Sequence, residues 1–331
     1  MLNQDLKLNS KIFSEDAEKE TNRKGFGEGL VLAAENNKNI VGLTADLTRS
    51  TSMDLFVDKY PERFVQVGVA EQNLITVAAG MAEMGKIPFV SSYAIFSPGR
   101  NWEQIRNVIC HNNLSVKIIA SHGGLSVGKD GASHQALEDL SLMRCLPHMT
   151  VLSPCDVFEA KKATIEAAKI DGPVYLRLSR DKTPQITTEE TLFEIGKAQM
   201  FFNPPMIAQA GIISTGPIIY KALQVAQKFA ERGISVKVLN ISSLRPLDFE
   251  SIINLAKEAG AIITVEDHQI VGGLGSSVSE VLAQNYPTPI EFVGVHDQFG
   301  QSGDPEELYN YYHMNISHIE AAVEKVLGRK K

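Results

Sequence analysis

The sequence predicts an α/β protein of two domains, each a mainly parallel β-sheet flanked by helices. Its 331 residues suit two domains of about 100–200 residues each. Short apolar runs alternate with longer amphipathic stretches, which is the pattern of parallel strands covered by helices. A polar, turn-rich stretch at 181–196 interrupts this alternation, so we expect the domain boundary there.

In the first half of the chain, a helix is expected just after Arg23. Apolar runs predict strands at 39–46, 87–93, 115–122, 149–154 and 173–179. The stretches between them predict helices at 71–85, 100–112, 134–146 and 156–170.

The second half repeats the alternation on a smaller scale. Strands are expected at 210–216, 234–240, 261–267 and 290–295, and helices at 247–260, 275–284, 316–328 and in a segment ending near Gly233. We divide the chain into an N-terminal extension (1–20) and two domains (21–188 and 189–331).

Composition excludes several classes of protein. The net charge of −7 disfavours nucleic-acid binding, which usually needs a basic surplus. No apolar run of about 18 residues is present, so we expect no membrane span. Three cysteines (Cys110, Cys145, Cys155) form no disulfide framework, and no Cys-x-x-Cys or His-x-x-x-His spacing predicts a metal site in this chain. The polar start is no secretory signal, so we expect a cytoplasmic protein.

Polar segments at strand ends are the candidate site, because open α/β sheets bind ligands beyond the carboxyl ends of their strands. The segment VGVAEQN places Glu71 at the start of an apolar helix. Glu71 is either a first-turn cap, favoured by the helix dipole, or an acid that exchanges a proton in a largely apolar site.

The segment SHGGLSVGKDGASHQ (121–135) is the densest candidate. It holds His122, Asp130 and His134 in a glycine-rich loop, and these residues are either structural or part of a site. The segment has neither the Gly-x-Ser-x-Gly pattern of a serine hydrolase nor the Gly-Lys-Ser/Thr ending of a phosphate loop.

Other residues allow two interpretations. Arg23 and Arg180 could bind a phosphate through their guanidinium forks or could be solvated surface charges. Tyr93 and Phe96 could be core residues or a platform for a ring. The turn GGLGSS (272–277) could bind an anion, but we favour tight packing.

Several motifs together resemble the C-terminal half of transketolases. The resemblance runs from about Arg23 to the end and rests on ADLTRSTS, DKYPERFVQVGVAEQN, GKDGASHQALEDLSLMR, SLRPLD and VEDHQIVGGLG, in that family's order. It implies a pyrimidine-binding domain at 21–188 and a transketolase C-terminal domain at 189–331.

The resemblance also implies that the diphosphate-binding domain of a transketolase lies on another chain. Transketolases bind thiamine diphosphate between two domains, and the diphosphate and its magnesium ion sit on the other domain through a Gly-Asp-Gly segment. That segment is absent here. The chain therefore resembles one subunit of a split transketolase, and an N-terminal partner subunit is expected to supply the diphosphate and magnesium site, giving a heterotetramer of the pentose phosphate pathway.

By the same resemblance, Glu71 is the acid that hydrogen-bonds the pyrimidine ring, while Phe96, Tyr93 and Asp46 lie on the cofactor side. Asp130 and His134 are expected to contact the sugar hydroxyl and carbonyl. The substrate phosphate group is expected to be gripped by Arg23, Ser50, His122 and Arg180. Glu71, His134 and His122 would be the catalytic residues.

The resemblance predicts transfer of a two-carbon glycolaldehyde unit from a ketose phosphate to an aldose phosphate. Three alternatives remain open. They are a deoxyxylulose phosphate synthase, the β subunit of a 2-oxoacid dehydrogenase, and a non-catalytic interaction subunit. The 2-oxoacid dehydrogenase would need no grip on a sugar phosphate, and the intact set of Glu71, Asp130 and His134 argues against loss of catalysis.

Overall fold

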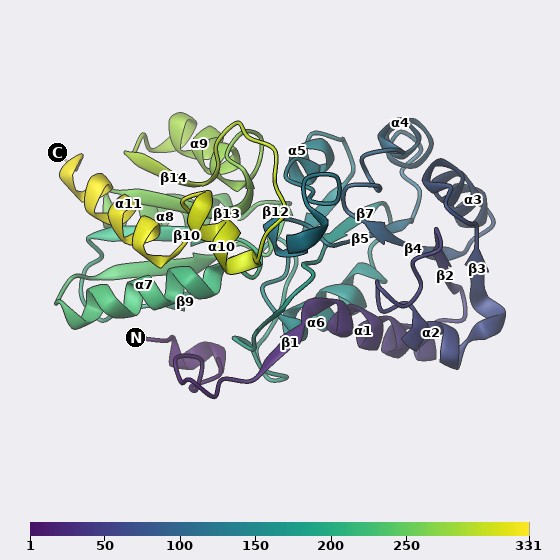
Figure 1. The fold of residues 1–331 in the computed structure, drawn as a ribbon, viewed down its shortest axis with the longest axis horizontal. Helices are drawn as coiled ribbons and strands as arrows, with labels where there is room; N and C mark the ends of the chain where they lie inside the picture. The colour runs from purple at the N-terminus through teal and green to yellow at the C-terminus, as the bar shows by residue number, and fades with distance from the viewer. Residues whose placement is uncertain (331) are drawn as a thin grey trace.

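The structure is a computed structural model that describes residues 1–330. Its first domain is built on a seven-stranded sheet (Figure 1), which confirms the predicted α/β class. Six neighbouring strands run parallel and β12 is antiparallel. In sheet order the strands are β12 (Ser243–Arg245), β6 (Thr150–Leu152), β7 (Val174–Arg177), β5 (Lys117–Ser121), β4 (Ile87–Tyr93), β2 (Ile40–Thr44) and β3 (Phe64–Gln66).

Helices cover both faces of this sheet. Successive strand residues alternate between the two faces, so Ile118 packs in one apolar cluster with α3 and α5, whereas Ile119 packs in another with α1, α2 and α6. The helices are α1 (Asn22–Asn36), α2 (Asp54–Lys59), α3 (Glu71–Glu83), α4 (Trp102–Gln104), α5 (Asp139–Arg144) and α6 (Val157–Ala167). Shorter turns are η1 (Gln4–Leu6), η2 (Pro61–Arg63), η3 (Ile105–Cys110) and η4 (Leu125–Asp130).

Two glycines bring α1 close to α6. A Cβ at Gly25 would lie 2.0 Å from the Val157 carbonyl oxygen, and one at Gly29 would lie 2.6 Å from the Lys161 carbonyl oxygen. Spaced four residues apart, both glycines lie on one face of α1. This close packing fixes the start of α1, which carries Arg23.

The second domain has a five-stranded sheet in which only β9 runs antiparallel. Its strands, in sheet order, are β14 (Ile290–Val295), β13 (Ile262–Gln269), β10 (Ala210–Ser214), β11 (Val236–Asn240) and β9 (Gln199–Phe202). Residues of α8 and α9 pack in one apolar cluster, and residues of α7, α10 and α11 pack in another. These helices are α7 (Ile219–Glu231), α8 (Phe249–Ala259), α9 (Leu274–Asn285), α10 (Pro305–Tyr311) and α11 (Ile316–Gly328).

The two domains are joined by buried contacts. One apolar cluster contains residues of both sheets, and β12 crosses from the second half of the chain to pair with β6. The buried Arg177 guanidinium donates to the Asp139 carboxylate at 2.8 Å and to the Asp267 backbone carbonyl at 2.9 Å. The loops at the junction are therefore held by both domains.

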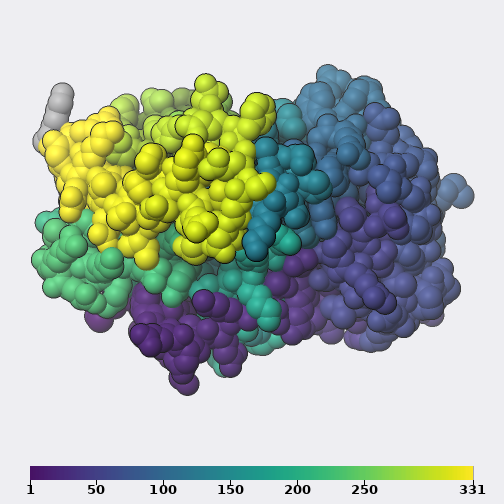
Figure 2. All heavy atoms as spheres, viewed as in Figure 1, coloured from purple at the N-terminus to yellow at the C-terminus, as the bar shows by residue number. Residues whose placement is uncertain are grey.

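The N-terminal segment packs along the second domain, where Figure 2 shows it in purple beneath the green surface. Ile12 is buried in the same apolar cluster as Phe201 and Phe202. The chain then forms β1 (Lys19–Thr21), which pairs antiparallel with β8 (Lys182–Pro184).

Two predicted helices differ in the structure. The segment 100–112 forms the short α4 followed by the π-helical turn η3. The helix predicted at 134–146 is confined to α5, because the amides of His134 and Gln135 bond back to the Gly131 carbonyl in a turn. His134 therefore lies in a loop.

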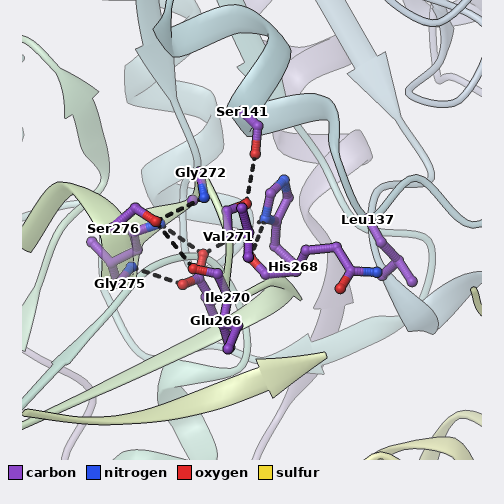
Figure 3. Close-up of polar contacts among 12 residues, drawn as sticks. Leu137, Ser141, Glu266, His268, Ile270, Val271, Gly272, Gly275 and Ser276 are labelled. Atoms are coloured by element: carbon purple, nitrogen blue, oxygen red, sulfur yellow. Dashed lines mark hydrogen bonds and ion pairs between the residues drawn. The ribbon is translucent and has the colours of Figure 1, made fainter. Parts of the chain in front are cut away.

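The GGLGSS turn packs tightly around the side chain of Glu266 (Figure 3). The Glu266 carboxylate accepts the backbone amides of Leu274 and Gly275 at the start of α9, at 2.7 and 2.8 Å. A Cβ at Gly273 would lie 2.0 Å from a Glu266 oxygen. The start of this helix is thus occupied by an internal carboxyl group, in agreement with the packing interpretation.

Across residues 1–330, every helix is too short or too polar to cross a lipid bilayer.

Candidate active site

The predicted site residues follow neighbouring strands of the first sheet. Tyr93 ends β4, His122 directly follows β5, and Arg180 lies three residues after β7. Asp46 follows β2, and Glu71 begins α3 after β3. Because the strand order is β7-β5-β4-β2-β3 and all five strands are parallel, these residues lie along one edge of the sheet.

Four ring side chains form a cluster at this edge. The Tyr93 and His122 rings are stacked, with centroids 3.8 Å apart and planes inclined by 23°. Phe96 lies 5.8 Å from Tyr93 and meets His134 edge-on at 5.4 Å. The two aromatic residues and the two histidines predicted from sequence therefore come together.

His122 is held as a neutral ring. It is buried, and its Nδ1 lies 2.6 Å from the Ser121 hydroxyl. Burial lowers the pKa of His122 to about 3, and the nearby charges of Arg23 and Arg180 act in the same direction. A neutral imidazole has one donor and one acceptor nitrogen, so His122 can hydrogen-bond a ligand hydroxyl at neutral pH.

Arg23 and Arg180 meet in a basic pocket. Arg23 donates to the backbone carbonyls of Ser50 and Arg180, the latter at 2.7 Å. The Arg180 guanidinium donates to the Val127 carbonyl, and its amide donates to the Ser126 hydroxyl at 3.1 Å. The pocket is lined by Thr21, Arg23, Gly128, Lys129, Arg180, Asp181, Lys182, Asp304 and Pro305. Four cations and two carboxylates line this pocket, so its net charge is positive and suits a phosphate or a similar anion.

Glu71 is buried at the first turn of α3 and paired with a cation. It is 4% exposed, and both of its carboxylate oxygens lie within 3.3 Å of the Arg100 guanidinium. The Arg100 guanidinium carbon in turn lies 4.3 Å from the centroid of the Phe96 ring. Arg100 therefore links Glu71 to the ring cluster.

Two predicted residues stand apart from these contacts. Asp46 and Asp130 are exposed, and within residues 1–330 neither carboxylate makes a hydrogen bond or ion pair. Asp46 has a left-handed backbone (φ 62°), and its amide donates to the Gln66 side chain at 2.8 Å. Both carboxylates are free to face a ligand or another chain.

Sequence reasoning missed Arg100, Lys129 and Lys182. Lys129 lies next to Asp130 in the glycine-rich loop, and Lys182 lies in the LSRDKTP segment at the end of a predicted strand. Both lysines could have been predicted as site residues, because both lie in polar segments at the ends of predicted strands. Arg100 lay in a segment expected to begin a helix.

The first domain matches the family model "Transketolase, pyrimidine binding domain" over residues 18–185. Residues 208–319 match "Transketolase, C-terminal domain". The chain belongs to the transketolase family.

Several curated relatives in this family are of similar length. The chain is 43% identical to a protein of Methanocaldococcus jannaschii described as a transketolase C-terminal section, covering 88% of this chain and 91% of that protein. It is 36% identical to a 6-deoxy-6-sulfo-D-fructose transketolase subunit of Clostridium sp., covering 93% of this chain and 95% of the relative. One subunit of an apulose-4-phosphate transketolase from Phocaeicola vulgatus is 34% identical, with 88% of this chain and 92% of the relative covered.

A solved structure shares this arrangement of domains. It is described as a split gene transketolase, inactive beta4 tetramer, and it superposes with a TM-score of 0.87 at 42% identity, covering 94% of this chain and 99% of that one. A transketolase from Campylobacter jejuni shares the fold with a TM-score of 0.77 at 21% identity, and this chain spans 50% of its length. The chain thus corresponds to the C-terminal subunit of a split transketolase.

The transketolase family depends on thiamine diphosphate, and the residues at this edge fit one part of that cofactor. A buried carboxyl group beside the exposed part of an aromatic cluster suits a flat, nitrogen-containing ring. Within residues 1–330, no group of three or more His, Cys, Asp or Glu side chains could hold a metal ion. The chain's residues therefore suit the pyrimidine ring of the cofactor.

Proposed function

We propose that this chain is one subunit of a ketol transferase that moves a two-carbon glycolaldehyde unit from a ketose phosphate to an aldose phosphate. An N-terminal partner subunit with a Gly-Asp-Gly segment would hold the diphosphate and magnesium ion. The active site then lies where the two chains meet, in a cytoplasmic heterotetramer serving the pentose phosphate pathway. In this proposal residues 21–188 form the pyrimidine-binding domain of the chain and residues 189–331 the transketolase C-terminal domain.

The observation that carries this proposal is that three features lie along one edge of the first sheet. The Glu71 carboxylate, the ring cluster of Tyr93 and Phe96, and the basic pocket around Arg180 follow β3, β4 and β7, which are parallel strands of one sheet. A cofactor ring and a substrate phosphate can therefore be bound at once, with the reacting carbon atoms between them.

When bound, thiamine diphosphate supplies the carbon nucleophile that cleaves the ketose carbon–carbon bond and carries the two-carbon unit. Glu71 holds a proton at the pyrimidine ring nitrogen, and Phe96 and Tyr93 orient that ring, with Asp46 nearby on the cofactor side.

The remaining residues act on the sugar. The half-buried His134 faces the hydroxyl and carbonyl groups beside the cleaved bond, where Asp130 accepts a hydrogen bond from a hydroxyl group. Hydrogen bonds to hydroxyl groups discriminate strongly against substrates that lack them. Arg23 and Arg180, with Ser50 and His122, grip the terminal phosphate group.

The preferred sugar is tested with a panel of donors. The relatives are named for sulfofructose and apulose phosphate, and a pocket with four cations accepts a phosphate or a sulfonate. The reconstituted complex is assayed with xylulose 5-phosphate, 6-deoxy-6-sulfofructose and pyruvate as donors and ribose 5-phosphate as acceptor. Transfer from a ketose supports the proposal, whereas turnover of pyruvate alone would replace it with a 2-oxoacid enzyme.

A further inference from the structure

Arg100 makes two contacts at the predicted pyrimidine position. Its Nη1 lies 3.1 and 3.3 Å from the two oxygens of the Glu71 carboxylate. Its guanidinium carbon lies 4.3 Å from the centroid of the Phe96 ring, in cation–π contact. A flat cation therefore lies against the same two side chains that we assign to the cofactor ring.

We propose that the Arg100 guanidinium occupies the place of the pyrimidine ring and is displaced when the ring binds. The inference rests on the proposed function, because it takes Glu71 and Phe96 as the contacts of the ring. The guanidinium and the pyrimidine ring cannot both lie against the Phe96 ring while bonding the same Glu71 oxygen. Binding of one therefore excludes the other.

The proton on Glu71 gives a chemical reason for displacement. A carboxylate paired with a guanidinium only accepts hydrogen bonds, whereas contact with an unprotonated ring nitrogen requires a carboxylic acid that donates one. Departure of the guanidinium thus leaves Glu71 free to hold the proton that the cofactor ring needs.

The surroundings of Arg100 let its side chain move while its backbone stays. The side chain is 52% exposed, so the guanidinium can turn into solvent. The backbone carbonyl of Arg100 accepts the Gln72 side-chain amide at 3.2 Å. The next residue, Asn101, donates to the Glu71 carbonyl at 2.9 Å. Displacement of the guanidinium therefore leaves α3 and the Phe96 turn in place.

The test measures binding of thiamine diphosphate, with magnesium, to the complex of both subunits by isothermal titration calorimetry. Arg100→Met should tighten binding about three- to tenfold, since the competing ion pair and ring contact are lost. Arg100→Lys keeps the charge and should restore affinity toward that of the wild type. Arg106→Met, an exposed arginine six residues away, is the matched control and should have no effect.

A double substitution separates this role from a structural one. In a Glu71→Gln background the ion pair is already absent and only the contact with Phe96 remains, so Arg100→Met should tighten binding clearly less than it does in the wild-type background. Weaker binding by Arg100→Met, or an equal effect in both backgrounds, would overturn the inference while leaving the proposed function intact. Failure of the wild-type complex to bind thiamine diphosphate would overturn both.

Discussion

The guanidinium of Arg23 donates a 2.7 Å hydrogen bond to the backbone carbonyl of Arg180, 157 residues later in the chain. Within residues 1–330, neither arginine is paired with a carboxylate. Neutral carbonyl groups orient the two guanidinium groups without cancelling their charge. Asp181 and Asp304 also line the pocket, but the four cations outnumber them, so a net positive charge remains available to a ligand.

Arg180→Met should weaken binding of phosphorylated donors specifically. The KM for a ketose phosphate should rise about 10- to 100-fold, the effect of losing one charge-assisted hydrogen bond, and the KM for the unphosphorylated ketose should stay the same. Steady-state kinetics of the reconstituted complex measure both. Arg232→Met, an exposed arginine in the second domain, is the control. Equal losses for both donors would show that Arg180 does not contact the phosphate.

Glu71→Gln should lower kcat by about 10²–10⁴-fold, because the amide cannot exchange the proton that the carboxyl group holds. The matched control is Glu83→Gln, which makes the same change at the exposed end of α3 and should retain activity. Single-turnover rates at saturating cofactor distinguish a chemical defect from weak binding. Full activity of the Glu71 variant would exclude this glutamate from proton transfer.

His122 should remain neutral across the physiological pH range. Its pKa of about 3 in the folded protein lies below the ordinary value of about 6.5. The neutral ring therefore stabilises the fold fully above pH 6.5, and this contribution is lost as the pH falls toward 3. Histidine ring signals in NMR spectra, assigned by comparison with His122→Gln, should show no His122 titration between pH 5 and 8. A midpoint near 6.5 would contradict the burial of this ring.

Arg177→Met should destabilise the junction between the domains by about 3–5 kcal/mol, because it leaves the buried Asp139 carboxylate without its cation. The free energy of unfolding in urea measures the loss. The control Lys228→Met removes an exposed pair with Glu320 and should cost at most about 1 kcal/mol. Similar losses for both variants would mean that the Arg177–Asp139 pair contributes no more than a surface pair.

The sequence predicted a strand or helix well where the apolar or amphipathic pattern lies within the residues of that element. The strand Ile87–Tyr93 and the helix Ile316–Gly328 have the predicted bounds. Apolar runs of strand length and amphipathic runs with a capping residue such as Asn315 determine such elements locally. The alternation of predicted strands and helices along the chain then predicted the parallel sheets.

Other features depend on contacts between distant segments, which local pattern does not contain. The pairing of β12 with β6 joins residues about 90 positions apart, and the short β3 has too few residues for a periodic signal. The aromatic and histidine residues could be named from motifs, but their stacking depends on the order of strands in the sheet. The contact of Arg100 with Glu71 depends on the turn at 94–101 that follows β4, so no spacing rule predicts it.

The most direct measurement of the central claim is reconstitution of activity from two chains. The tagged protein is captured from its native lysate with its partner, and the complex is assayed for transfer from xylulose 5-phosphate to ribose 5-phosphate with thiamine diphosphate and magnesium. The chain alone and a complex carrying Glu71→Gln serve as controls. We predict transfer only by the complex that contains a Gly-Asp-Gly-bearing chain and an intact Glu71. Transfer by the chain alone, or no cofactor-dependent transfer by the complex, would contradict the account.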